Sequence, residues 1–404
     1  MRNVYLDHAA TTPLDSRVLE AMLPFMKESF GNPSSFHSVG KDGKDAIDDA
    51  RDAMSKILHV RADELLFTSG GTESDNMAVL GFCRANAVHG KHLIVTSFEH
   101  HAVIEAAMHL EKKEGFEVTY LSPDHDGMIT VDQVMAAIRP DTILVSVMYA
   151  NNEIGTIQPI GEIGNAIQKH RASGNKVPGN PALPVFHTDA CQATGALDLD
   201  VEKLHVDMMT INGSKMYGPK GVGALYVRRG LKLQPLQFGG SQERGIRPGT
   251  ENVSGIIGMA KALEIAQGER VAESARLTVL RDALIAGIRA RIPKVRLNGH
   301  ATKRLPNNVN ISFMDIEGEA FILYLDASGI YASTGSACTS TTLDPSHVIL
   351  ALGLPYEVAH GSVRFSLGHS TTDADIEYVL NTIPPLVEKL RALSPVCVDP
   401  KYYV

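Results

Sequence analysis

The sequence predicts an α/β fold in which a mostly parallel sheet carries helices on both faces. Between residues 65 and 212, short apolar runs alternate with stretches of helical periodicity, as in successive βαβ units. Few polar residues interrupt these runs, which is typical of strands buried on both faces. After about residue 253 the alternation weakens and longer helical stretches surround two strand-like runs, which indicates a second, smaller α+β domain.

The individual elements follow from these patterns. Apolar residues every three or four positions predict helices at 16–28, 41–58, 72–88, 101–113, 131–138 and 161–170. The apolar runs predict strands at 65–69, 92–97, 116–122, 142–149, 184–190, 207–212 and 223–227. Further along, we expect helices at 253–292, 317–326 and 372–393 and strands at 307–313 and 362–367. These elements predict a large domain of residues 15–253 and a small domain of residues 1–14 and 254–404.

Composition and charge exclude several classes of protein. The net charge of −8 and the lack of a long basic run argue against direct binding of nucleic acid. No apolar stretch approaches the ~18 residues of a membrane span, and the N-terminus has no apolar signal core, so we expect a cytoplasmic protein. The four cysteines have neither a disulfide pattern nor zinc spacing, and we expect free thiols and no metal site.

Lys215 lies in a turn between two apolar runs that read as buried strands. A lysine at the edge of a core loses hydration, which lowers its pKa and prepares its amine to form a Schiff base. The alternative is an ordinary turn lysine in water, which is the commoner case for an isolated lysine. Other polar groups of the chain that could bind the same ligand as the lysine favour the reactive amine.

A glycine-rich turn, residues 68–74, joins a strand to a helix. Gly71 lets the backbone approach a ligand closely, and Thr72 adds a hydroxyl to the N–H groups at the start of the helix. Phosphate is the natural guest, and the alternative is a plain capped helix. The spacing matches neither the P-loop nor the dinucleotide-binding fingerprint.

Two more polar groups follow predicted strands. Asp189 ends a buried strand, where a carboxylate needs a cationic partner such as a protonated ring nitrogen. An acid for a pyridinium nitrogen and a lysine for an aldehyde together describe pyridoxal phosphate. The alternative for Asp189 is a helix cap. His100 could stack on a flat cofactor and move protons, or could be a surface or capping histidine.

The segment from 332 to 346 is built of small and polar residues around Cys338. With no bulky apolar anchor near it, Cys338 cannot be a packed core cysteine, and we expect a mobile loop with an exposed, reactive thiol. The alternative is an incidental exposed cysteine. Arg364, inside a predicted strand, suits a substrate carboxylate through its guanidinium, or an internal salt bridge.

With these pieces placed, the chain resembles the cysteine desulfurases of the NifS/IscS type, group I, which are pyridoxal-phosphate enzymes of the class V aminotransferase family. The resemblance extends from YLDHAATTP at residues 5–13 to the last helix. Its motifs include SGGTESDN (69–76), EHHAV (99–103), NNEIG (151–155), HTDACQATG (187–195), KMYGPKGVGALYV (215–227), RPGTEN (247–252), STGSACTS (333–340) and VRFSLG (363–368). It implies the type I fold of pyridoxal-phosphate enzymes, with a seven-stranded sheet.

The resemblance also implies roles around the cofactor ring. Lys215 would hold pyridoxal phosphate through a Schiff base and move the Cα proton of the substrate. His100 would stack on the ring and act in acid–base steps. Asp189 would pair with the pyridine nitrogen, and Asn152 and Gln192 would lie on the ring hydroxyl side.

The remaining implied roles concern phosphate and substrate. Gly71, Thr72 and Ser214 would bind the phosphate, with Asn212 nearby, and Thr250 would reach the phosphate of a second subunit in a homodimer. The carboxylate of L-cysteine would bind Arg364 and lie near Asn152. Cys338 would attack the substrate sulfur, leaving L-alanine and a persulfide that an iron–sulfur scaffold or a tRNA thiolase would accept.

The chain differs from the family pattern at two places, and three other functions are alternatives to this prediction. The family usually has Ser-x-His-Lys where this chain has residues 212–215, so Ser214 replaces a histidine, and residues 173–184 look like an inserted surface loop. Within the same fold, an aminotransferase or a selenocysteine lyase is an alternative, although transamination needs no reactive thiol. From another class, the alternative is a non-catalytic sulfur carrier or docking protein.

Overall fold

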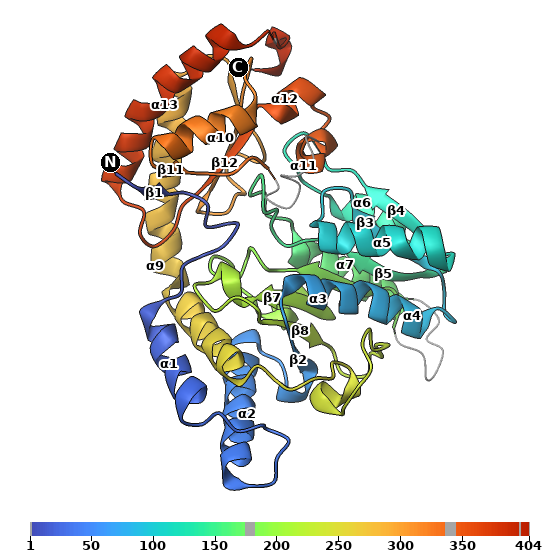
Figure 1. The fold of residues 1–404 in the computed structure, drawn as a ribbon. Coiled ribbons are helices and arrows are strands. Elements are labelled where there is room, and N and C mark those ends of the chain that lie inside the picture. The colour runs from blue at the N-terminus through green and yellow to red at the C-terminus, as the bar shows by residue number, and fades with distance from the viewer. Residues whose placement is uncertain (1, 174–181, 336–344, 396, 404) are drawn as a thin grey trace.

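The computed structural model describes residues 2–173, 182–335, 345–395 and 397–403. At its centre lies a seven-stranded sheet with the strand order β2-β8-β7-β6-β5-β3-β4 (Figure 1). The strands are β2 (Leu65–Thr68), β3 (His92–Thr96), β4 (Glu117–Leu121), β5 (Thr142–Ser146), β6 (Val185–Asp189), β7 (Met208–Asn212) and β8 (Gly223–Val227). β8 runs antiparallel to both neighbours, whereas the other adjacent pairs in this sheet are parallel. The predicted fold class is confirmed.

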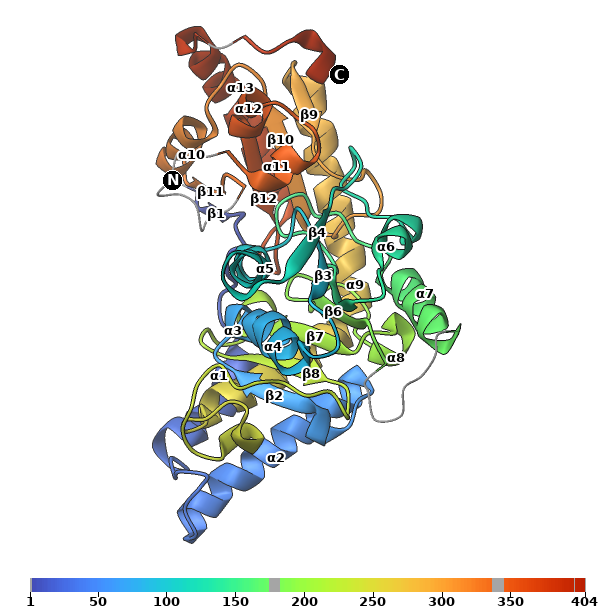
Figure 2. The same ribbon diagram turned by 90° about the vertical axis from the view of Figure 1, so that its right-hand side faces the viewer.

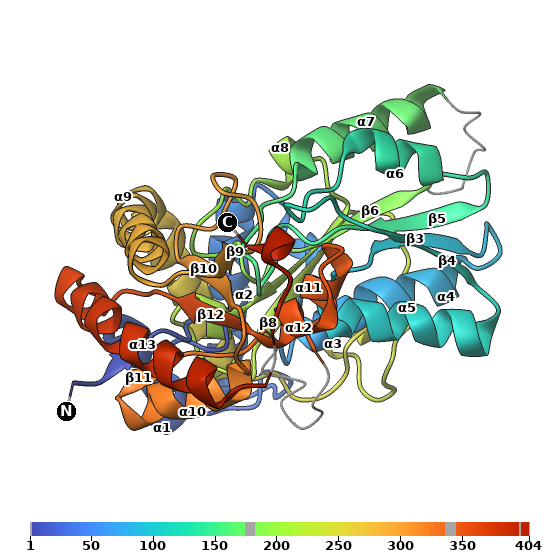
Figure 3. The ribbon, with the colours of Figure 1, turned by 90° about the horizontal axis from the view of Figure 1, so that it is seen from above.

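Helices cover both faces of this sheet (Figure 3). One face carries α3 (Gly71–Asn76), α4 (Phe82–Asn86) and α5 (His101–Glu114), and the other carries α6 (Val131–Ala137), α7 (Ile160–Ser173) and α8 (Val201–Leu204). Neighbouring strand residues enter different cores, since Leu66 packs in the cluster under α5 while Phe67 packs in the cluster under α7. Burial on both sides explains the unbroken apolar runs of the strands.

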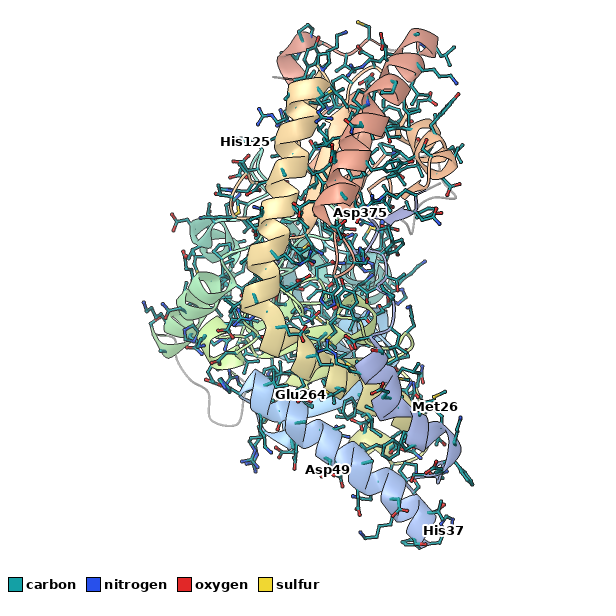
Figure 4. The ribbon with its side chains drawn as sticks, turned by 90° about the vertical axis from the view of Figure 1, so that its left-hand side faces the viewer. Met26, His37, Asp49, His125, Glu264 and Asp375 are labelled. Atoms are coloured by element: carbon teal, nitrogen blue, oxygen red, sulfur yellow. The ribbon has the colours of Figure 1, made fainter. Side chains whose placement is uncertain are left out.

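The longest helix, α9 (Val253–Arg291), spans 39 residues and connects two regions of the molecule. Figure 4 shows its lower part beside α1 (Ser16–Lys27) and α2 (Ser38–Leu58) and its upper part beside α13 (Asp373–Leu393). Its first half packs in the same core as α2, and its second half packs in a separate core with α13. No helix among the residues described is long and apolar enough to cross a membrane.

The separate core belongs to a smaller antiparallel sheet, β12-β10-β9, which lies above the large sheet in Figure 2. Its strands are β9 (Val295–Leu297), β10 (Asn308–Phe313) and β12 (Ser362–Ser366), and α10 (Gly318–Ala327) and α13 pack in its core. The short helices α11 (His347–Ala351) and α12 (Tyr356–His360) instead bury their apolar side chains in the core that α2 and α7 share. The N-terminal strand β1 (Val4–Tyr5) joins this part by pairing with β11 (Ile330–Tyr331). The division of the chain at residue 253 stays a prediction.

Several helices differ from their predicted bounds, and α7, predicted at 161–170, extends to Ser173. α2 begins at Ser38, three residues before the predicted start, because the His37 ring caps it by accepting the N–H of Gly40 at 3.1 Å. Gly40 and Gly43 weaken the helical signal at that end, so the pattern starts late. The helix predicted at 72–88 is divided by a π-helical turn, Met77–Gly81, between α3 and α4.

Candidate active site

A cavity of about 240 Å³ opens where the strands of the large sheet end. Segments that follow β2, β3, β5, β6 and β7 line it, as expected for ligand sites at the carboxyl ends of parallel strands. The predicted site residues that line it are Gly71, Thr72, His100, Asn152, Asp189, Gln192, Asn212, Lys215 and Arg364. Ser214 and Thr250 are not among its lining residues, and Cys338 lies outside the described residues.

Lys215 ends a tight turn, Gly213–Lys215, that directly follows β7. Its Nζ donates to the carbonyl oxygen of Ala9 at 2.9 Å and to that of Ala10. The same N-terminal segment is tied to the turn by Thr12, whose backbone N–H donates to the Ser214 carbonyl at 3.1 Å. The lysine amine is therefore aimed by a segment about 200 positions away in the chain, and sequence patterns gave no signal for these carbonyl contacts.

The glycine-rich turn between β2 and α3 forms one wall of the cavity. A Cβ at Gly71 would come within 2.8 Å of the Cys191 sulfur and 3.6 Å of the Asn212 amide nitrogen, so only glycine fits there without a shift. The Asn212 side-chain oxygen accepts from the Ser214 N–H at 3.0 Å and from its hydroxyl at 3.1 Å. This leaves the Asn212 amide group beside Gly71 and the N–H groups that begin α3. In this structure the Ser214 hydroxyl is turned to Asn212 instead of to the cavity.

Two buried carboxyl groups reach the cavity, one of them absent from the predicted set. Asp189 ends β6, and one of its oxygens accepts the Cys191 N–H at 2.8 Å. Asp75 is fully buried on α3, and burial, followed by the charge of Asp189, raises its pKa well above the usual range. Its nearest cationic candidate, His187 at 3.7 Å, is neutral at physiological pH, because burial lowers its pKa to about 4. Asp75 belongs to the motif SGGTESDN, but nothing in the sequence indicated that its side chain is buried.

His100 lines the cavity and caps a helix at the same time, so the capping interpretation is confirmed, whereas stacking on a cofactor stays a prediction. It precedes α5, and its Nδ1 accepts the N–H of Ala102 at 3.1 Å. Because Nδ1 accepts, the ring proton of the neutral form is on Nε2. Burial lowers the pKa of His100, which favours this neutral form.

Arg364 forms the internal salt bridge that was one of its two predicted roles, whereas binding of a substrate carboxylate stays a prediction. It is buried in β12, and its Nη2 pairs with Asp7 at 2.8 Å. Its Nη1 donates at 3.1 Å to the carbonyl oxygens of Asn152 and Gly335. Its Nε has no hydrogen-bond partner among the residues that the structure describes. One N–H of a rigidly held guanidinium therefore remains for a ligand.

Comparison with known proteins identifies the family. The model of the aminotransferase class-V family matches residues 4–379. The chain belongs to the aminotransferase class-V family. Within the family, the cysteine desulfurase IscS of Methanosarcina thermophila is 52% identical over 400 residues, which cover 99% of this chain and 95% of the relative. This relationship makes the chain an enzyme of the cysteine desulfurase type, as the sequence predicts.

Solved structures of the family agree. A NifS-like protein superposes with a TM-score of 0.87 at 35% identity, covering 96% of this chain and 100% of its own. A structure described as SspA in complex with cysteine superposes with a TM-score of 0.77 at 36% identity, covering 90% of this chain and 99% of its own. Cysteine desulfurases and other class V members are pyridoxal-phosphate enzymes.

Proposed function

We propose that this chain binds pyridoxal phosphate in the cavity, removes sulfur from L-cysteine with release of L-alanine, and receives that sulfur on Cys338. The observation that carries the proposal is that Lys215, Asp189 and Arg364 line one cavity although they come from different parts of the chain. An amine for an aldehyde, a buried acid for a ring nitrogen and a guanidinium for a carboxylate match the cofactor and the substrate together.

The residues of the cavity fit the cofactor. The space kept free by Gly71, next to the Asn212 amide and the start of α3, suits the phosphate. Asp189 would keep the ring nitrogen protonated, and His100 would face the ring. When bound, the group supplies an electron sink that weakens bonds at Cα and Cβ of the substrate. Ser214 would have to turn away from Asn212 to reach the phosphate.

The substrate would be held at the β12 side of the cavity. The free Nε–H of Arg364 would donate to the carboxylate of L-cysteine, beside Asn152. The Lys215 amine would take the proton from Cα and return a proton at the end of the reaction. The solved complex of SspA with cysteine supports this choice of substrate.

Sulfur transfer would be carried out by Cys338. Both ends of its segment are anchored near the cavity, Gly335 through its carbonyl to Arg364 at 3.1 Å and Ser346 through its hydroxyl to Glu153 at 2.5 Å. In the transfer, the Cβ–S bond breaks, an S–S bond to the Cys338 sulfur forms, and a proton is added to Cβ to give alanine. Burial raises the pKa of both Cys83 and Cys191, so neither supplies a thiolate. Transfer onward to an iron–sulfur scaffold or a tRNA thiolase stays a prediction.

A homodimer belongs to the same proposal. Large apolar side chains are exposed on α1 and just after it, where Figure 4 labels Met26, and Phe238 is exposed before the segment that carries Thr250. Phe30 keeps 73% of its surface accessible. A group of large exposed apolar side chains is typical of a surface that another protein covers. A second copy would cover this surface, and Thr250 would then reach the phosphate of that copy.

Mass spectrometry tests the proposal. After incubation with L-cysteine, we expect L-alanine in solution and one added sulfur atom on the Cys338 peptide, and none with Cys338→Ala. Cys397→Ala, which alters a thiol in the C-terminal tail, is the matched control and should behave like the unaltered chain. Borohydride reduction should fix a pyridoxyl group on the Lys215 peptide. A pyridoxyl group on another residue, or alanine without sulfur on Cys338, would overturn the proposal.

A further inference from the structure

A second, smaller cavity of about 50 Å³ adjoins the first at Lys215. Lys215 and Gln192 line both cavities. The other walls of the second cavity include His8 from the N-terminal segment, Tyr217 after the lysine turn, and Glu273 on α9. A water molecule needs about 10–15 Å³ of such space, so this cavity has room for more than one.

His8 presents an unpaired nitrogen in this region. The residue is buried, with only 3% of its surface accessible. Nδ1 lies 3.0 Å from the carbonyl oxygen of Ser366, and because a carbonyl only accepts, Nδ1 carries the hydrogen. Burial lowers the pKa of His8, so the ring is neutral and Nε2 has a lone pair. No group among the described residues donates to Nε2.

Gly368 keeps the space beside this nitrogen open. A Cβ at Gly368 would come to 2.2 Å from His8 Nε2 and 2.5 Å from the Tyr217 hydroxyl. The Tyr217 hydroxyl accepts the His369 N–H at 2.8 Å, and the two rings stack with centroids 3.7 Å apart. His369 Nε2 in turn lies 3.9 Å from Glu273, which is partly accessible to solvent. Polar groups in the walls of the second cavity, which Lys215 also lines, therefore extend to a partly exposed carboxylate.

We propose that the second cavity holds water bonded to His8 Nε2, and that this water and His8 exchange the proton on Lys215 with solvent during turnover. The inference rests on the proposed function, because Lys215 acquires that proton from Cα of the substrate. Lys215 gives its proton to the water, and the water gives a proton to His8 Nε2. After exchange of the water with solvent, His8 returns its proton to the water, and Lys215 regains from the water a proton of solvent origin. No electrons move and no bond other than N–H and O–H bonds changes.

The proposal predicts the fate of a labelled proton. In one turnover of the holoenzyme with Cα-deuterated L-cysteine in ordinary water, the alanine formed should have lost most of its Cα deuterium. His8→Phe removes the accepting nitrogen, and Gly368→Ala places a methyl group against that nitrogen, so each should raise the retained deuterium several-fold. Tyr5→Phe is the control, since Tyr5 packs against the His8 ring with centroids 4.8 Å apart but does not line the cavity.

The outcomes separate the two proposals. Alanine with the same deuterium content from His8→Phe, Gly368→Ala and the unaltered enzyme would overturn the role of the second cavity and leave the proposed function intact. Two folded variants that form no alanine would also overturn it, because a role in exchange changes the label and not the chemistry. No alanine from the unaltered enzyme would overturn the proposed function, and this inference with it.

Discussion

Replacing Glu99 by glutamine is expected to remove a pH-dependent loss of stability. Glu99 is completely buried, and one of its oxygens accepts the Thr96 hydroxyl at 2.9 Å and the Met148 N–H at 2.8 Å. Its other oxygen has no partner among the described residues. Burial raises the pKa of Glu99 from 4.5 to about 8. Between these values the folded state binds a proton that the unfolded state does not, so stability falls as pH rises through this window.

The size of the effect follows from the shift. Linkage gives a loss of roughly 3 kcal/mol between about pH 5 and about pH 8. Glutamine is neutral throughout and preserves the accepting oxygen. With about 2.1 cal/mol/K of unfolding entropy per residue, 1 kcal/mol moves the Tm of a chain of this length by roughly 1 °C. The Tm of Glu99→Gln minus the Tm of the unaltered protein should therefore be about 3–4 °C larger at about pH 8 than at about pH 5.

Calorimetry at the two pH values measures this difference. Glu105→Gln is the control, because Glu105 is exposed on the neighbouring helix α5, and its difference from the unaltered protein should not change with pH. An equal difference for Glu99→Gln at both pH values would refute the reasoning, since it would mean that the buried carboxyl group does not hold a proton in the folded state.

Three further predictions follow from other contacts. Arg51→Met should lower the Tm by about 3–5 °C, because it leaves the buried Glu243 carboxylate without the guanidinium at 2.5 Å, and adding Glu243→Gln should recover part of the loss in the same calorimetric scan. Arg364→Lys should raise KM for L-cysteine about 10–100-fold in initial-rate measurements, and an unchanged KM would contradict carboxylate binding there. Gly71→Ala should weaken pyridoxal-phosphate binding about tenfold in equilibrium dialysis, and adding Cys191→Ala should restore part of it, because the new Cβ lies 2.8 Å from the Cys191 sulfur; wild-type affinity in Gly71→Ala would be the contrary result.

The large sheet could be predicted from sequence because its strands, apart from the edge strand β4, are buried on both faces. Such strands read as unbroken apolar runs, and polar residues at or beyond the ends of several of them lie at the cavity, as Asp189 and His100 do. What the sequence could not supply are contacts between distant segments. The carbonyl groups of Ala9 and Ala10 against Lys215 carry no side-chain signal, since any residue provides a carbonyl.

Side-chain burial was the other quantity that patterns did not reveal. Asp75 follows the glycine-rich turn on a helix whose polar sequence, GTESDN, is typical of an exposed element, yet it is buried against the sheet. Arg364 and His100 each allowed two readings because the sequence does not show how many bonds one side chain makes. The structure assigns several to each: an ion pair and carbonyl contacts for Arg364, and a helix cap at the cavity wall for His100.

The contacts that hold Lys215 have a consequence for the order in which the protein folds and binds its cofactor during translation. The first residues leave the ribosome early, but β1 pairs with residues 330–331, and the Ala9 N–H donates to the Ser366 hydroxyl at 2.9 Å. At about 5–20 residues per second, those partners emerge many seconds after Ala9 does. The nascent chain can thus complete its central sheet while Lys215 still lacks these neighbours, and capture of a vitamin-derived coenzyme is expected to wait until residue 366 has emerged.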